Sequence, residues 1–311
     1  MKALTAEPAR GAVPLAAYGH LLVIYIVWGC TYLAVKICLT GDAAITVPQL
    51  QTARVWVSGA LLAGLAWWRA GPLTRPSSRD LMLCFVSGAL MWVVGNSVSA
   101  VAARHAASGF IIMALGAIPL WSSLLELIIA RTLPGRRVIF GLLLGAAGLF
   151  LVVAPALFDP TTPIIEPGYA GMTILLLMIA GISWSLGTII QRPLNRTMRP
   201  EWAATLQMGA AALVLTPMML ADGAPLPGVP GMDQLFGFGF LVVFASVIGL
   251  TSYIQVLRNF SPVVASTFAY VNPVVGVLLG WLLLGEVPEP LSIAGLAVVL
   301  ASIAIVISRP R

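Results

Sequence analysis

Long apolar runs follow one another along the chain, separated by short segments that contain charged residues, prolines or glycines. Each run is close to the roughly 20 residues with which an α-helix crosses the hydrocarbon layer of a bilayer. The pattern therefore predicts an all-α polytopic membrane protein with ten transmembrane helices. We place these helices at 17–39, 47–68, 80–102, 107–130, 138–157, 168–190, 201–220, 234–256, 263–284 and 291–308.

The composition agrees with this pattern. Of the 311 residues, 59% are hydrophobic and 9% are charged, and the mean hydropathy is +0.99. In a soluble domain about a quarter of the residues are charged, so this composition excludes a soluble protein. Cys30, Cys38 and Cys84 lie inside apolar runs without the spacing of metal ligands, and we expect them to be packing residues.

Landmark residues recur at a constant distance, which predicts an internal duplication. Residues 154 positions apart match in five pairs: Gly95 and Gly249, Arg104 and Arg258, Pro119 and Pro273, Pro134 and Pro288, and Gly141 and Gly295. Two five-helix repeats, 17–157 and 168–308, follow from this offset. Because five is odd, the repeats have opposite orientations in the membrane. Inverted repeats are typical of secondary transporters that work by alternating access.

The basic residues predict the orientation. With the N-terminus inside, fourteen of the 17 basic residues fall on inner segments. The positive-inside rule therefore places both termini in the cytoplasm. The net charge of +6 comes from these short loops and does not indicate a nucleic-acid surface. The inner residues are Lys2, Arg10, Arg69, Arg75, Arg79, Arg131, Arg136, Arg137, Arg192, Arg196, Arg199, Arg258, Arg309 and Arg311.

The segment GAIPLWSSLLELIIAR places polar residues inside an apolar run. Pro119, Ser122, Ser123 and Glu126 follow at helical spacing and share one face. Two interpretations of Glu126 stay open. In the first, it pairs with Arg131 or another inner-side arginine, or reaches toward the membrane interface. In the second, it binds a substrate ammonium or carries a proton, as intramembrane ionisable groups often do.

Aromatic side chains lie in the middle of several predicted helices, away from the interfaces where tryptophan normally collects. Trp28 and Trp184 lie at corresponding positions of the two halves. Tyr32 follows Trp28 by one turn, and Tyr253 and Tyr270 lie in the eighth and ninth runs. These rings either fill the interhelical core or line a cavity for apolar or aromatic groups.

Neutral polar side chains also occur within the apolar runs. Asn96, Gln207, Gln255 and Asn272 either line a pathway for zwitterions or hydrogen-bond neighbouring helices. Asn272 precedes Pro273, which repeats the kink predicted at Pro119. We therefore expect the two proline-bearing helices to flank the pathway.

A further group is predicted toward the outer side. Its members are Lys36, Arg54, Arg104 and His105. They either form an outer vestibule that attracts carboxylates or pair with Asp42 and lipid headgroups.

Three segments resemble the EamA family of the drug/metabolite transporter superfamily: YIVWGCTYLAVK, VPQLQTARVWVSGALLAG and NPVVGVLLGWLLLGEVPEPLSIAGLAVVL. The resemblance implies a ten-helix inner-membrane exporter of small metabolites such as amino acids, with both termini cytoplasmic. The chain departs from the family pattern at one place. Where the second unit has Gly285 and Glu286, the first has Arg131 and Thr132.

The expected function is secondary transport, with a passive facilitator or channel, or a multidrug exporter, as the alternatives. No phosphate-binding GxxxxGK[ST] or zinc-binding HExxH motif occurs, so we expect no enzyme, cofactor or metal. The expected partners are a small-molecule substrate, the lipid bilayer and protons, but no nucleic acid, and the protein acts as a monomer or homodimer. The predicted substrate-binding residues are Trp28, Tyr32, Asn96, Ser122, Glu126, Trp184, Tyr253, Tyr270 and Asn272.

Overall fold

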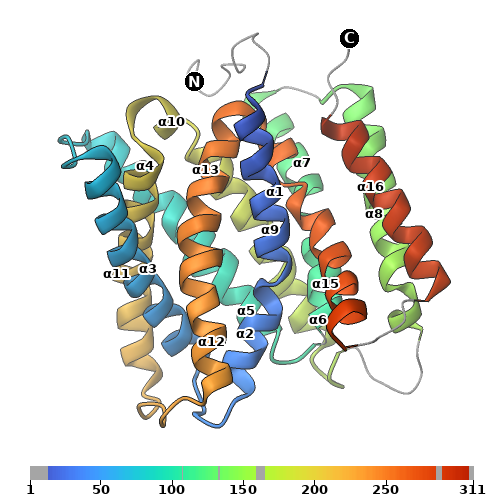
Figure 1. The fold of residues 1–311 in the computed structure, drawn as a ribbon, viewed down its shortest axis with the longest axis horizontal. Helices are drawn as coiled ribbons and strands as arrows, with labels where there is room; N and C mark the ends of the chain where they lie inside the picture. The colour runs from blue at the N-terminus through green and yellow to red at the C-terminus, as the bar shows by residue number, and fades with distance from the viewer. Residues whose placement is uncertain (1–12, 107, 132–133, 159–164, 285–288, 308–311) are drawn as a thin grey trace.

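The computed structural model describes residues 13–106, 108–131, 134–158, 165–284 and 289–307. The protein is all-α, with 81% helix and no strand in these described ranges. Ala106 and Ile165 form one isolated antiparallel bridge. The predicted fold class is confirmed at this level, and the helices form one bundle whose long axes run roughly in the same direction (Figure 1).

The helices fall where the apolar runs predict them. The first half contains α1 (Leu15–Gly29), α2 (Thr31–Thr40), α3 (Val47–Ala70), α4 (Ser78–Gly88), η2 (Ala89–Ser97), α5 (Val98–Ala102), α6 (Ser108–Leu115), α7 (Ile118–Ala130) and α8 (Arg136–Leu157). The second half contains α9 (Ala170–Ile190), α10 (Leu194–Thr197), α11 (Pro200–Asp222), α12 (Met232–Phe240), η3 (Leu241–Ile248), α13 (Gly249–Asn259), α14 (Pro262–Ala265), α15 (Phe268–Leu284) and α16 (Pro290–Ile307).

Local sequence explains where several helices begin. The Thr46 side chain accepts a hydrogen bond from the Gln49 N–H, and the Gln49 side chain accepts one from the Thr46 N–H. This capping box, with Pro48 in the first turn, starts α3. Ser77 and Ser261 cap α4 and α14 with their hydroxyls.

Two long helical stacks each contain a π-helical segment at the same place. In the first half, η2 separates α4 from α5, and in the second half, η3 separates α12 from α13. A π-turn is wider than an α-turn, and such segments are frequent at functional sites. Both segments face the centre of the bundle, where they pack against α9 and α1 respectively.

Six helices or continuous helical stacks are long and apolar enough to cross a membrane, by length and composition. They are Leu15–Thr40, Ser78–Ala102, Ala170–Thr197, Pro200–Asp222, Met232–Asn259 and Pro290–Ile307. Ile118–Ile129 and Pro262–Val275 are shorter apolar helices. The structure therefore supports a membrane protein with multiple spans, while the ten-helix arrangement stays a prediction.

Glycines allow α8 and α16 to pack closely at one side of the bundle (Figure 1). A Cβ atom on Gly148 would lie 2.8 Å from the Val299 nitrogen, and one on Gly295 would lie 2.6 Å from the Val152 nitrogen. Both neighbours are main-chain atoms, so a larger residue would push the helices apart. Gly141 lies about two turns before Gly148, and a Cβ atom there would lie 2.6 Å from a side-chain carbon of Val306.

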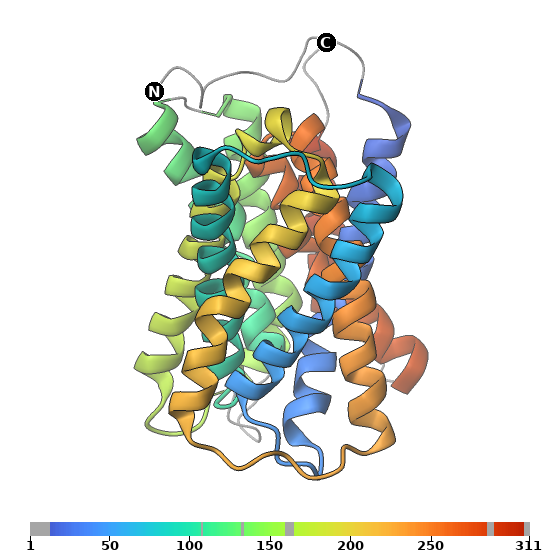
Figure 2. The same ribbon diagram turned by 90° about the vertical axis from the view of Figure 1, so that its left-hand side faces the viewer.

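α1 and α9 each contact several other helices. α1 packs against α13 and α15, and α9 packs against η2, α5 and α7. α3 and α11 lie together on another side (Figure 2), joined by a hydrogen bond from the Thr52 hydroxyl to the Leu215 carbonyl at 3.1 Å. α1 begins and α16 ends at the same end of the bundle (Figure 1).

Candidate functional site

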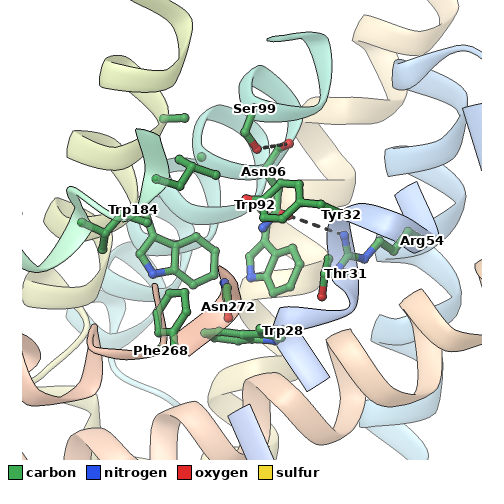
Figure 3. A pocket seen from close by; sticks show the side chains of 14 residues that line it. Trp28, Thr31, Tyr32, Arg54, Trp92, Asn96, Ser99, Trp184, Phe268 and Asn272 are labelled. Carbon is green, nitrogen blue, oxygen red and sulfur yellow. Dashed lines mark hydrogen bonds between the residues drawn. The ribbon is translucent and has the colours of Figure 1, made fainter. Parts of the chain in front are cut away.

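A cavity lies at the centre of the bundle, where the break between α1 and α2 meets η2, α9 and α15. Residues from both halves of the chain line it: Trp28, Thr31, Tyr32, Arg54, Trp92, Gly95, Asn96, Ser99, Leu115, Ile118, Ala180, Trp184, Phe268 and Asn272 (Figure 3). The cavity has a volume of about 50 Å³. This is room for a few water molecules, so a solute of amino-acid size requires the walls to move.

The helix break builds one side of the cavity. Cys30 separates α1 from α2, and its N–H bonds to the Val27 carbonyl at 3.3 Å. Trp28 lies just before the break, and Thr31 and Tyr32 lie just after it. The break therefore brings an aromatic ring and two hydroxyl-bearing side chains to the same cavity.

Aromatic rings pack edge to face along the cavity (Figure 3). The Trp28 ring lies 5.4 Å from that of Trp184 at 88° and 4.6 Å from that of Phe268 at 80°. Trp184 continues the group to Trp92, with 6.1 Å between the ring centroids. Edge-to-face packing of this kind stabilises aromatic clusters beyond the burial of their area. The cluster gives the cavity a wide apolar surface.

Arg54 provides the cationic group of the cavity. It is 1% exposed, its Nε–H donates to the Ser246 hydroxyl at 2.9 Å, and one terminal NH₂ donates to the Asn96 side-chain oxygen at 3.5 Å. The guanidinium carbon lies 5.1 Å from the centroid of the Trp92 ring, within cation–π range. Within the described ranges, no carboxylate forms an ion pair with it.

Five of the predicted substrate-binding residues line the cavity: Trp28, Tyr32, Asn96, Trp184 and Asn272. Asn272 is 5% exposed, and its side-chain oxygen has no hydrogen-bond partner in the described part of the chain. A buried oxygen without a partner is uncommon, because it costs desolvation energy. It is an acceptor available to a bound solute.

The other four predicted residues lie outside the cavity walls, each with its own partner. The Ser122 hydroxyl donates to that of Ser185 at 3.1 Å, and the Tyr253 hydroxyl shares a 2.8 Å hydrogen bond with Thr188. The Tyr270 hydroxyl donates to the Leu142 carbonyl at 2.8 Å, which joins α15 to α8. Tyr253 still packs against the Trp28 ring, with 5.0 Å between the centroids.

Glu126 forms an ion pair with Arg192, with 3.1 Å between the carboxylate and the guanidinium. The Glu126 side chain is 13% exposed and that of Arg192 is 20% exposed. Of the two interpretations of Glu126, the structure therefore shows the pairing with an arginine predicted on the inner side, which is Arg192. The ion pair connects α7 of the first half to the segment after α9 of the second half.

Polar contacts continue from the cavity toward the end of the bundle where α1 begins. Along α9, they follow Trp184 in the order Thr188 with Tyr253, Gln191 with Gln207 at 2.8 Å, and Arg192 with Glu126. Each contact joins α9, or the turn that follows it, to another helix. The bundle is therefore closed by successive polar layers on this side of the cavity.

The predicted outer group is divided in the structure. Arg54 lies in the cavity wall, whereas Lys36 and Arg104 are exposed. His105 forms a 2.8 Å contact with the Glu166 carboxylate, and its ring stacks on that of Tyr169 at 4.0 Å. His105 is thus a hydrogen-bonded residue at the end of a helix.

Sequence reasoning missed several cavity residues. Trp92 and Phe268 lie in apolar runs whose pattern gives no sign of which side faces the centre. Arg54 had a stronger signal, because it lies seven residues after the start of α3, about 10 Å into the helix. Ionisable groups at such depth usually face a cavity or the bundle interior. Glu286, the acidic residue of the family pattern, lies outside the described residues.

No group of three or more His, Cys, Asp or Glu side chains that could hold a metal ion occurs among the described residues. Glu126, Glu166 and Glu201 each pair instead with a basic residue. The chemistry that the cavity offers is binding by one guanidinium, amide and hydroxyl groups, and aromatic rings.

Comparisons with known proteins agree with a transport function. Residues 171–308 match the model of the EamA-like transporter family. The chain is 28% identical to "Uncharacterized inner membrane transporter YedA" of Escherichia coli, over 96% of this chain and 92% of YedA. It is 25% identical to the "S-adenosylmethionine/S-adenosylhomocysteine transporter" of Chlamydia trachomatis, over 84% of this chain and 79% of that protein.

Two further similarities extend over most of the chain. The "Probable terminal-alkyne amino-acid exporter" of Streptantibioticus cattleyicolor is 23% identical, over 93% of this chain and 92% of that protein. A structure described as "Crystal structure of protein" superposes with a TM-score of 0.74 at 16% identity, covering 94% of this chain and 97% of that one. The second half of the chain thus matches the EamA-like transporter family, and nearly the whole chain is similar to proteins that are named as membrane transporters.

Proposed function

We propose that this protein is a secondary transporter of the cell inner membrane that exports small metabolites by alternating access. Ten transmembrane helices form two inverted repeats, 17–157 and 168–308, and amino acids are the first substrate class to test. The observation that carries the proposal is the central cavity, because residues of both halves line it. Rearranging one half against the other would open it to either side of the membrane.

The order of the helices supports the two repeats. α3 and α11 begin at residues 47 and 200, η2 and η3 at 89 and 241, and α8 and α16 at 136 and 290. These starts differ by 152 to 154 residues, close to the offset of the matching landmarks. The packing also corresponds, because α1 contacts α13 and α15 as α9 contacts α5 and α7.

The charge of the loops supports an N-terminus on the cytoplasmic side. α1 begins and α16 ends at one end of the bundle (Figure 1), which agrees with both termini on the same side. The arginines between α3 and α4, and those around α10, belong to this same end. With the positive-inside rule, the polar layers along α9 then close the cavity toward the cytoplasm.

In this orientation, the Glu126–Arg192 ion pair is an inner gate. It joins the two halves as the last of the polar layers, so an inward-open state requires it to break. Protonation of Glu126 would weaken the pair by removing the carboxylate charge. Protons are therefore the coupling ion that we propose to test first.

Counterflow in proteoliposomes tests the proposal. Purified wild type, Glu126→Gln and the control Glu289→Gln are reconstituted with a labelled pool of amino acids, aromatic metabolites or hydrophobic dyes, at two pH values. Glu289 is exposed at the start of α16, so this control removes a carboxylate outside the gate. Saturable, competable counterflow supports a carrier. Comparing the labelled solutes shows whether the carrier transports amino acids or hydrophobic compounds.

Two outcomes would contradict parts of the proposal. Flux that grows linearly with concentration and is not competed would indicate a facilitator or channel. Counterflow whose pH dependence is equal in wild type and Glu126→Gln would remove Glu126 from proton coupling, while leaving alternating access in place.

A further inference from the structure

We propose that Arg54 is the anion-binding group of the cavity and that it binds the carboxylate of the transported solute. The ligand class is a small carboxylate with an apolar or aromatic body. This inference rests on the proposed transport function and names the chemistry of its central site.

The first observation is the burial of a cation without a carboxylate. Arg54 is 1% exposed, and no Asp or Glu oxygen of the described residues lies within 4.0 Å of its nitrogens. Two of the described carboxylates, those of Glu126 and Glu166, pair with other residues, Arg192 and His105. Burying an arginine without a counter-charge is costly. An anionic solute in the cavity would supply the missing charge.

The second observation is the way in which the guanidinium is held. Neutral acceptors bind it on two sides, the Ser246 hydroxyl in η3 and the Asn96 oxygen in η2. Arg54 thus joins the π-segments of both halves and lies in the same cavity as Tyr32 (Figure 3). These neutral partners orient the guanidinium group without neutralising its positive charge. A planar, oriented guanidinium suits bidentate binding of a carboxylate.

The corresponding position in the second half shows that packing does not require a cation. Gln207 lies seven residues after the start of α11, as Arg54 does in α3. Gln207 is fully buried, and its side-chain NH₂ donates to the Ser87 hydroxyl at 3.0 Å and the Gln191 oxygen at 2.8 Å. A neutral amide therefore connects neighbouring helices at this position, and the charge at position 54 needs another explanation.

The other cavity walls indicate the remainder of the ligand. The aromatic rings of Trp28, Trp92 and Trp184 offer an apolar surface beside Arg54. The Asn272 oxygen is buried without a partner in the described part of the chain and accepts a hydrogen bond from an ammonium or hydroxyl group. The carboxylate and the aromatic body are thus placed on different walls of one cavity.

Binding to purified protein in detergent tests this inference separately from transport. Three probes share a phenyl ring: 3-phenylpropionate has only a carboxylate, phenethylamine has only an amine, and phenylalanine has both. Wild type is compared with Arg54→Gln, Arg54→Lys and the control Lys36→Gln, which removes an exposed positive charge. Affinity is measured by ligand-induced thermal stabilisation, and folding by gel filtration.

We expect wild type to bind 3-phenylpropionate and phenylalanine at least about tenfold more tightly than phenethylamine, because a charge-assisted hydrogen bond to Arg54 contributes about this much affinity. Arg54→Gln abolishes this preference, Arg54→Lys reduces it because the bidentate fork is lost, and Lys36→Gln keeps it. If Arg54→Gln does not fold, the conservative variant Arg54→Lys is tested instead. We expect it to bind carboxylates less tightly than wild type and to bind phenethylamine with unchanged affinity.

The inference is overturned if wild type binds neither carboxylate, or if folded Arg54→Gln or Arg54→Lys keeps the full preference. Counterflow of neutral or cationic solutes alone would also overturn it, while leaving the transporter in place. Carboxylate binding that depends on Arg54, without counterflow of any solute, would support the site and contradict the proposed transport function.

Discussion

Trp28 in the first half and Trp184 in the second half occupy corresponding places, but their contacts differ. The Trp28 indole N–H donates to the Ala245 carbonyl at 3.0 Å, in the π-segment of the second half, and its ring lies against Gly249. Trp184 lies against Gly95, in the π-segment of the first half, but makes no equivalent hydrogen bond within the described ranges. Each half thus docks on the π-segment of the other, with unequal strength.

Arg54 and Gln207 extend this comparison to the polar residues. Both are buried on the same turn of corresponding helices, yet one faces the cavity and the other lies in the polar layers that close it. The first half therefore places a cation in the cavity wall, whereas the second half has a neutral amide at the corresponding turn. If the two halves are repeats, as we propose, differences between equivalent residues such as these give the cavity its chemistry.

The largest effect is expected where a glycine contacts tryptophan. A Cβ at position 249 would collide with the Trp28 indole, which is held by its hydrogen bond. A Cβ at position 95 would lie 3.2 Å from the Leu90 carbonyl and 3.3 Å from Trp184, contacts that a small shift relieves. We expect Gly249→Ala to destabilise the protein by about 3 kcal/mol and Gly95→Ala by less than about 1 kcal/mol. Thermal unfolding in detergent measures both changes in stability. Equal losses of stability would contradict the conclusion that the two halves contact each other with unequal strength.

The next effect concerns the ion pair that joins the halves. Glu126→Gln leaves the partly buried Arg192 without its counter-charge. We expect a loss of about 2 kcal/mol, below the cost for a fully buried pair because both side chains retain some contact with water. Thermal unfolding of Glu126→Gln and the exposed control Glu289→Gln measures the difference. A loss no greater than that of the control would show that the pair does not hold the halves together.

A smaller effect separates the two tryptophans. Trp28→Phe and Trp184→Phe remove similar volume, but only the first removes a hydrogen bond to a main-chain carbonyl. We expect Trp28→Phe to be less stable than Trp184→Phe by about 1 kcal/mol, the net value of one buried hydrogen bond. The melting temperatures of the pair, compared in one detergent, give this difference. The reverse order would mean that Trp184 holds the halves more strongly.

The smallest effect is expected at Tyr270, which lies away from the cavity. Tyr270→Phe loses the hydrogen bond to the Leu142 carbonyl, a change of about 0.5 kcal/mol, and leaves counterflow unchanged. Tyr32→Phe, in the cavity wall, is the matched variant of the other half and alters the apparent affinity for the solute. Altered affinity in Tyr270→Phe would return this residue to the predicted substrate site.

The sequence by itself determined the apolar helices, their approximate ends and the resemblance to membrane transporters. Apolar runs of membrane-spanning length admit one secondary structure, because main-chain groups in lipid must be satisfied within a helix. The predicted runs accordingly fall on the observed helices, and the glycines of α8 meet α16 closely. Trp28 and Trp184, which the repeat places at corresponding positions, both reach the cavity.

Only the tertiary structure decided which of the polar and aromatic residues meet. Helical spacing gives the face on which a side chain lies, but not the helix that this face contacts. Glu126 pairs with Arg192, which is 66 residues away, and Arg54 bonds to Ser246 at a distance of 192 residues along the chain. Such long-range pairs are set by the packing of whole helices. The same packing draws Arg54 into the cavity and leaves Tyr270 outside it.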